Sequence, residues 1–470
     1  MASETWDIII VGAGSAGCLL ANRLSAPPER KRVLLLEAGG PDSHPMIKVP
    51  IGFTRLMYDP SVTYPYMTEP EPHLDGRRVS VVRGKVLGGC SAINGMIYMR
   101  GQRQDYDDWA ALPGCTGWSF AELLPYFKRS EGYQVDETPN PFHGRDGELD
   151  VTRVATTYPI TEAYMAAAEQ VGIARNSDLN GARQEGIGFA DVNMRKGRRW
   201  SSADAFLSRS VRRRDNLEVR LHTLARRLVL EGKRVVGVEI EDAQGQVKRL
   251  QASEVVLSAG AYNTPPLLEL SGIGDPKVLQ GLGIDVCHPL GGVGASLQDH
   301  LQLWVQQGVK TRQTLSEDGK FPRVVWSVLR YLATRKGPLA FPAASVGAFV
   351  STTPGERPIF QLHFTPGAGA MDEHGRMGAS PEPGVNSTVC VIRPTSRGTV
   401  HAADNDPRTP PRILHNYLST EHDRTLSIEG FRLQRRIYAA EPFARYATHE
   451  LNPGPEVQSD DEILDFWRRE

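Results

Sequence analysis

The chain has 470 residues, of which 40% are apolar and 23% are charged, a composition typical of a folded globular protein rather than a disordered or membrane-spanning one. This length exceeds what one hydrophobic core supports, so we expect two or more domains. Lysine and arginine (54) nearly balance aspartate and glutamate (55), so no overall field would draw the chain to nucleic acid or to an anionic membrane surface.

The cysteines and the N-terminus also narrow the possible classes of protein. The five cysteines are scattered and form no CxxC pair, which argues against a disulfide framework and against a zinc ribbon. The first residues carry acids where a signal peptide needs a basic region, and no uninterrupted apolar run has membrane-spanning length. We therefore predict a cytoplasmic protein with no membrane span, no metal site and no nucleic-acid partner.

The first pattern that carries chemistry is a glycine-rich turn between a strand and a helix. Residues 7–11 form a β-branched run, residues 18–24 have helical apolar spacing, and residues 32–37 form a second apolar run. Between the strand and the helix lies Gly12-x-Gly14-x-x-Gly17. This order of strand, turn, helix and strand is the context in which the motif predicts a dinucleotide-binding unit.

Each part of this turn has an expected role. Gly12 permits the tight turn, Gly14 lets the backbone approach the pyrophosphate, and Gly17 lets the helix pack closely on the strand. The helix begins at Ser15 and Ala16, where free N–H groups and a positive partial charge attract phosphate.

A carboxylate at the end of the second strand completes the unit. Glu37, followed by Ala38, lies about twenty residues beyond the turn, where it can accept hydrogen bonds from ribose hydroxyls. A carboxylate there would repel a 2′-phosphate, which disfavours NADP. The motif alone leaves both FAD and NAD open.

The following segments suggest an excursion away from the first unit and a return to it. Prolines and isolated aromatics between residues 41 and 78 predict an extended path over the surface. Residues 217–241 alternate apolar and polar side chains around a hairpin turn at residues 231–233, and residues 254–260 form another buried strand.

The pattern changes after about residue 301. Residues 324–334 and 424–440 are amphipathic, and short strands such as residues 359–364 lie between them. We assign this part of the chain to a separate domain that covers the substrate.

Two further glycine-containing stretches are distinctive. Residues 83–101 read RGKVLGGCSAINGMIYMRG, and residues 260–274 read GAYNTPPLLELSGIG. In the first, small residues allow the main chain to lie against a flat ring system, and a helix that starts there directs N–H donors at it.

These two stretches resemble the two signatures of the glucose–methanol–choline (GMC) oxidoreductases, the first of which cradles the flavin and its pyrophosphate. Other family-like phrases occur in the expected order, at residues 142–144, 201–203, 292–294, 297–300, 337–339 and 393–398. The resemblance implies FAD rather than NAD, and it is closest to the choline dehydrogenase and aliphatic alcohol dehydrogenase branch.

Carried over by position, the resemblance also implies specific contacts to FAD. They include a backbone contact to the adenine side at Ala225, and the others fall at Val86, Gly89, Asn94, Gly95, Met96 and Ile97. Some relatives tether the flavin through a histidine immediately before this asparagine. That position is Ile93 here, so we predict noncovalent FAD.

The resemblance implies an α/β fold in which a Rossmann-like FAD-binding domain is interleaved with an α+β substrate domain built on an antiparallel sheet. We place the FAD-binding domain at residues 1–157 and 191–300, with its C-terminal part missing. The substrate-binding domain then comprises residues 158–190 and 301–470.

The implied function is an FAD-dependent oxidoreductase acting on the CH–OH group of an alcohol. In the family, a histidine in a His-Pro-x-Gly-Thr phrase takes the alcohol proton while hydride passes to flavin N5. We expect the chain to stop before this phrase, since residues 450–470 do not contain it. His288-Pro289-Leu290-Gly291 imitates the phrase, but its neighbours place it in a different loop, so no catalytic residue is assigned.

Two other interpretations stay open at this point. The chain could be a catalytically incompetent flavin-binding fragment or degenerate homologue, because the general base is not found. An NAD-dependent dehydrogenase fits the first motif but not the later ones. The expected partners are a small-molecule alcohol and an electron acceptor that could be a quinone, a dye-like carrier or oxygen, and the sequence does not identify the alcohol.

Overall fold

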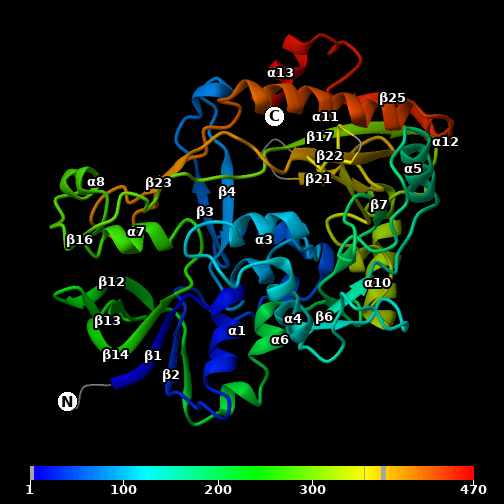
Figure 1. Cartoon of the computed structure of the whole chain (residues 1–470). Coiled ribbons are helices and arrows are strands. Elements are labelled where there is room, and N and C mark those ends of the chain that lie inside the picture. The colour runs from blue at the N-terminus through cyan, green and yellow to red at the C-terminus, as the bar shows by residue number, and fades with distance from the viewer. Residues whose placement is uncertain (1–4, 354, 372–376) are drawn as a thin grey trace.

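Two six-stranded sheets organise the chain in the computed structural model, which describes residues 5–353, 355–371 and 377–470. The first sheet has the strand order β11-β2-β1-β14-β13-β12, and the second has the order β25-β17-β22-β19-β18-β7. The first sheet lies at the bottom of Figure 1 and the second lies at the upper right.

The first sheet combines a parallel core with an antiparallel hairpin. Its four parallel strands are β1 (Thr5–Val11), β2 (Val33–Leu36), β11 (Leu217–Arg220) and β14 (Val247–Leu257), and its hairpin is β12 (Leu224–Glu231) with β13 (Arg234–Glu241). The predicted strand–helix–strand unit and the predicted hairpin are therefore both confirmed.

Both faces of this sheet are covered, which explains why β1 and β2 are apolar without alternation. On one face Ile8 and Ile10 pack with helix α1 (Ser15–Leu24) and α6 (Ser202–Phe206). On the other face Ile9 packs with the hairpin and with Leu267 of α7 (Thr264–Glu269).

The second sheet is antiparallel throughout. Its strands are β7 (Gly186–Phe189), β17 (Gln302–Val309), β18 (Val346–Val350), β19 (Phe360–Thr365), β22 (Gly384–Val391) and β25 (Ala447–Asn452). Helices α5 (Pro159–Gln170) and α11 (Glu421–Ala439) share its hydrophobic core. Figure 1 shows α11 along the side of the sheet that faces away from the first sheet.

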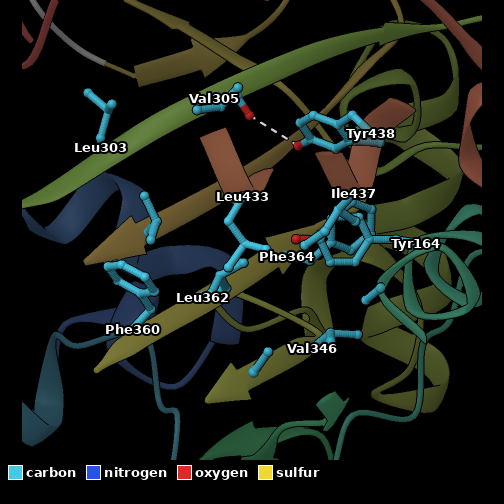
Figure 2. Packing of buried hydrophobic residues seen from close by; sticks show 14 of the residues in the cluster. Tyr164, Leu303, Val305, Val346, Phe360, Leu362, Phe364, Leu433, Ile437 and Tyr438 are labelled. Carbon is cyan, nitrogen blue, oxygen red and sulfur yellow. Dashed lines mark hydrogen bonds between the residues drawn. The ribbon is translucent and has the colours of Figure 1, made fainter. Parts of the chain in front are cut away.

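Strand β19 of the second sheet alternates between an apolar and a polar face. In β19, Phe360, Leu362 and Phe364 are buried in the core shared with α11. Figure 2 shows this packing, in which the Tyr438 hydroxyl donates to the Val305 carbonyl oxygen at 3.1 Å. The intervening residues of β19 therefore point to the opposite face, because successive side chains alternate along a strand.

Shorter elements connect and flank the two sheets. The helices are α2 (Phe53–Leu56), α3 (Arg103–Ala110), α4 (Phe120–Ser130), α8 (Pro276–Gly281), α9 (Leu315–Asp318), α10 (Arg323–Thr334), α12 (Glu441–Ala444) and α13 (Asp460–Arg469). The strands are β3 (Thr63–Met67), β4 (Ser80–Gly84), β5 (Glu131–Tyr133), β6 (Leu149–Arg153), β8 (Asp191–Val192), β9 (Met194–Arg195), β10 (Arg198–Arg199), β15 (Ile273–Gly274), β16 (His288–Pro289), β20 (Gly369–Met371), β21 (Met377–Ala379), β23 (Thr399–His401) and β24 (Arg412–Leu414).

The predicted fold class is confirmed, since a parallel-cored α/β sheet and an antiparallel sheet alternate along one chain. The exact domain boundaries stay a prediction. One segment of the predicted substrate domain, residues 402–411, lies against the first sheet's ligand cavity. Within the described ranges, no helix combines the length and apolar character that a membrane span requires.

Phe431 of α11 should be a principal support of the second core. Its side chain is 0% exposed and packs against the ring of Phe466 with centroids 6.0 Å apart. We expect Phe431→Ala to lower the free energy of unfolding by about 3–5 kcal/mol because it leaves a cavity. Chemical denaturation measures this change. The exposed Leu112→Ala should change it by less than about 0.5 kcal/mol, and equal effects of the two variants would contradict the assignment.

Candidate functional site

A cavity of about 760 Å³ opens at the carboxyl ends of β1, β2 and β14. Val11, Leu36 and Leu257, the last residues of these strands, line it. Ligands of open α/β sheets bind in this position, because the helices that follow the strands begin there. The cavity is also lined by residues 64–66 and 83–85, by residues 223–225 and by residues 402–404 and 406–411.

The glycine turn after β1 has a geometry that only glycine accommodates. Gly12 has φ +99°, and a Cβ there would lie 2.5 Å from the Ser258 carbonyl oxygen. A Cβ on Gly17 would lie 1.9 Å from the Gly12 carbonyl oxygen, so helix α1 can pack on the strand only without it. Gly17 therefore allows the close packing of α1 on the turn, and it does not line the cavity.

The N-terminus of α1 is oriented to receive an anion. Gly14 is its N-cap and supplies no side-chain cap, and the first backbone bond of the helix runs from Cys18 N to the Gly14 oxygen at 3.0 Å. Gly14, Ser15 and Ala16 all line the cavity. N–H groups of a first helical turn have no intrahelical acceptor, so here they are suited to bind phosphate.

Glu37 is a buried carboxylate in the wall of the same cavity. It is 6% exposed, and its two oxygens accept from Ala13 N at 3.0 Å and from Gly39 N at 2.8 Å. Burial raises the pKa of Glu37 to about 7, although the two backbone donors oppose the shift. Each oxygen keeps a second lone pair for a ligand hydroxyl. Ala38 lines the cavity beside it.

The second glycine loop packs directly onto the first. Gly89 has φ +54°, and a Cβ there would lie 2.7 Å from Gly14 Cα. Next to it, Gly88 N donates to the Ala13 carbonyl oxygen at 2.8 Å. Gly89 therefore joins the cavity wall. Ala225, near the start of β12, also lines this cavity.

The remaining predicted contacts lie outside the cavity wall. The Val86 side chain is 1% exposed and packs in a small apolar cluster with Ile93. Asn94 is exposed, whereas Met96 is buried and has φ +66°. Ile97 forms an isolated bridge with Val192. These positions stay predictions for the contacts to FAD.

Gly95 connects this loop to the second sheet. Its carbonyl oxygen accepts from Ala343 N at 3.2 Å, and a Cβ on Gly95 would lie 2.4 Å from Ala343 Cβ. Ala343 in turn accepts from the hydroxyl of Thr365, in β19, at 2.6 Å. The loop at residues 94–97 therefore extends from the cavity toward the polar face of the second sheet.

Arg199 supports this loop, a role that its local sequence does not indicate. Its guanidinium donates to the carbonyl oxygens of Ile47, Ser91 and Asn94 and to Asn94 Oδ1, at 2.6–3.1 Å. Burial lowers the pKa of Arg199 to about 10, since its side chain is almost fully enclosed. Nothing in the pattern Arg198-Arg199 distinguishes the buried arginine from its exposed neighbour.

The segment at residues 402–411 is a second part of the site that local sequence patterns do not predict. Buried Glu269 of α7 accepts from Ala402 N at 2.7 Å and lies 2.6 Å from His401 Nδ1. These contacts hold the segment over the cavity, although it is more than 130 residues away in sequence. No local signal predicts this contact, because it depends on two residues meeting in the fold.

The arrangement fits a bound FAD. The cavity is lined by a glycine turn, a helix N-terminus with free N–H groups and a buried carboxylate. It is also lined by a second glycine loop, whose main chain packs against the main chain of the first turn. The turn and helix would hold the pyrophosphate, Glu37 would hold the ribose of the adenosine half, and the second glycine loop would support the flavin side.

Comparison with known proteins identifies the family. Two family models described as GMC oxidoreductase match residues 6–302 and residues 394–470. The chain belongs to the GMC oxidoreductase family. GMC oxidoreductases are FAD-dependent, so FAD is the cofactor of this family member.

Relatives with curated names are dehydrogenases. The chain is 40% identical to the alcohol dehydrogenase [acceptor] of Pseudomonas putida over 98% of its own length and 83% of that protein. It is also 40% identical to the mitochondrial choline dehydrogenase of Mus musculus, over 99% of this chain and 78% of that one. Such relatives support an oxidoreductase that turns over, and they do not favour a flavin-binding protein without activity.

Solved structures share the fold. Pyridoxine 4-oxidase from Mesorbium loti superposes with a TM-score of 0.87 at 30% identity, covering 99% of this chain and 86% of that one. A formate oxidase variant from Aspergillus oryzae reaches a TM-score of 0.91 at 23% identity, covering 100% of this chain and 87% of that one, and supports the fold alone.

Glu37 should make FAD binding depend on pH. Ribose hydroxyls donate best to the ionised carboxylate, so FAD affinity should rise as the pH increases through about 7, where Glu37 loses its proton. Glu37→Gln should weaken binding about tenfold or more and flatten this dependence. Flavin fluorescence titration at several pH values measures both effects. The exposed Glu29→Gln is the control, and an unchanged pH slope in Glu37→Gln would contradict the role.

Arg199 should matter for both stability and cofactor retention. Arg199→Met leaves four acceptors without their donor, and we expect it to lower the free energy of unfolding by about 3 kcal/mol and to weaken FAD binding. Arg199→Lys should recover only part of the loss, because an ammonium cannot reach all four acceptors. Arg198→Met on the same hairpin is the matched control. Full FAD affinity in Arg199→Met would show that the loop needs no such support.

Proposed function

We propose that this chain oxidises an uncharged primary or secondary alcohol, with noncovalently bound FAD, and passes the electrons to a carrier rather than to oxygen. The single observation that carries the choice of alcohol is the polar face of the second sheet, where strands β7, β17, β18, β19 and β22 contain no charged residue. Bound FAD would supply flavin N5, the atom that accepts a hydride from the carbon bearing the hydroxyl.

The polar face is the surface that we assign to the substrate. It lies opposite the core shared with α11, on the side of the first sheet (Figure 1). Thr365 on this face connects through Ala343 to Gly95 of the cofactor loop. The hydrogen-bonding groups that the strands present here belong to Gln302, Gln361, His363 and Thr388.

His363 is the centre of this polar group. Its Nδ1 lies 3.3 Å from both Gln302 Nε2 and Thr388 Oγ1, and its Nε2 lies 3.2 Å from Gln361 Nε2. Burial, together with nearby His300, lowers the pKa of His363 to about 4. The imidazole is therefore neutral at ordinary pH and suited to bind an uncharged hydroxyl.

The charge of the face discriminates between two classes of alcohol. A quaternary ammonium such as choline is bound by aromatic faces together with a compensating carboxylate. Strands β7, β17, β18, β19 and β22 contain no aspartate or glutamate. Asp299, just before β17, accepts from the Tyr417 hydroxyl at 2.5 Å. The lack of a carboxylate on these five strands favours a neutral alcohol over choline.

Two further parts of the proposal rest on separate observations. Ile93 is 8% exposed in an apolar cluster and offers no nucleophile to the flavin, which supports noncovalent binding. The relative from Pseudomonas putida is named for a general acceptor, which supports a dehydrogenase.

The decisive experiment uses the FAD-loaded protein without oxygen. We expect aliphatic alcohols to bleach the flavin band, choline to do so more slowly at equal concentration, and a quinone or dye to restore the colour faster than air. Acid precipitation should release the flavin into the supernatant. Bleaching by choline alone would overturn the choice of substrate, and absence of bleaching by every alcohol would overturn the activity.

His363→Asn tests the substrate face. The loss of neutral hydrogen bonds should raise KM for the alcohol about three- to tenfold, with FAD content unchanged. Because the pKa of His363 is about 4, this histidine does not titrate near neutral pH. The pH–rate profiles of the unmodified protein and of the variant should therefore have the same shape in that range. The exposed His449→Asn is the control. An unchanged KM in His363→Asn would place the substrate elsewhere.

A further inference from the structure

Helix α10 exposes its apolar face and buries part of its polar face. Only Ser327 and Tyr331 of this helix are buried. The Tyr331 hydroxyl donates to the carbonyl oxygen of Gly197 at 3.2 Å and can also reach that of Lys48 at 3.4 Å. Two polar residues therefore anchor the helix to the protein.

The apolar side chains of α10 lie on the opposite side. Exposed fractions are 73% for Trp326, 60% for Leu332, 50% for Leu329 and 47% for Val325. At about 100° per residue these side chains share one arc of the helix. Phe321, just before the helix, is 85% exposed. Large apolar side chains gathered at one place on a surface mark an interaction site.

A basic rim surrounds this arc. Residues 323–336 contain Arg323, Arg330, Arg335 and Lys336 and no acidic residue. The hairpin of β9 and β10 adds exposed Lys196 and Arg198, because its Gly197 packs against the Arg335 carbonyl. The chain as a whole has a net charge of −1, so this positive region is a local feature that the overall composition does not reveal.

These features match a helix that lies in the surface of an anionic bilayer. Such a helix places Trp, Phe and Leu in the lipid boundary and Lys or Arg beside the headgroups. With twelve residues, α10 is roughly 18 Å long. That is shorter than the roughly 30 Å of a hydrocarbon core, so the helix would lie along the surface rather than cross it.

We propose that α10, with Phe321 and its basic rim, docks this protein onto membranes that contain anionic lipid. A second copy of the chain is the other occupant that an apolar face suggests. Pairing two α10 helices would bring their basic rims together, and like charges across an interface are unfavourable. Anionic headgroups neutralise the same charges, which favours the lipid surface.

The experiment measures co-sedimentation of the FAD-loaded protein with vesicles of phosphatidylcholine alone or of phosphatidylcholine with phosphatidylglycerol. We expect binding to the anionic vesicles, weakened by added salt. Trp326→Gln/Leu329→Gln should lower the partition coefficient about tenfold or more. Arg330→Gln/Lys336→Gln should lower it and reduce the salt dependence. Trp118→Gln is the matched control, since Trp118 is 51% exposed and lies outside α10 and its basic rim.

Analytical ultracentrifugation completes the test. The proposal is overturned if the protein ignores anionic vesicles, or if Trp118→Gln loses binding as much as the α10 variant. It is also overturned if the protein forms a dimer that Trp326→Gln/Leu329→Gln disperses while lipid binding is absent. Flavin reduction by a water-soluble alcohol should be unchanged in the α10 variants, which separates this outcome from failure of the proposed activity.

Discussion

The site depends on main chain packing against main chain at two glycine loops. Gly89 approaches Gly14 so closely that a Cβ would lie 2.7 Å from its Cα, and Gly88 N donates to the Ala13 oxygen at 2.8 Å. This contact brings the loop after β4 to the N-terminus of α1. A side chain at Gly89 would push the loops apart and open the cavity wall between them.

The same loop couples the cofactor side to the substrate side. Arg199 fixes the loop and its surroundings through four hydrogen bonds. Gly95 of the same loop accepts a hydrogen bond from Ala343, next to the polar face of the second sheet. A buried guanidinium is costly unless its donors are satisfied. Here backbone and amide oxygens satisfy them, so the position of the loop and the burial of Arg199 depend on each other.

Helices α10 and α11 illustrate how the fold decides whether the apolar face of an amphipathic helix is buried or exposed. Both α10 and α11 have clear helical periodicity, yet α11 buries its apolar face while α10 exposes it. The difference lies in what each helix meets. The sheet offers α11 an apolar surface, whereas Gly197 and Lys48 offer α10 carbonyl oxygens that bond the Tyr331 hydroxyl.

Local residue patterns are sufficient to predict the secondary-structure units and the family. The turn at Gly12, the hairpin, the β19 strand and both amphipathic helices follow from residue periodicity and glycine placement, which are local properties. The family followed from ordered motifs. Only the tertiary structure decided that Arg199 is buried beneath the loop, that residues 402–411 cover the cavity and that α10 faces outward. Each of these depends on contacts between residues distant in sequence, and local patterns do not encode such contacts.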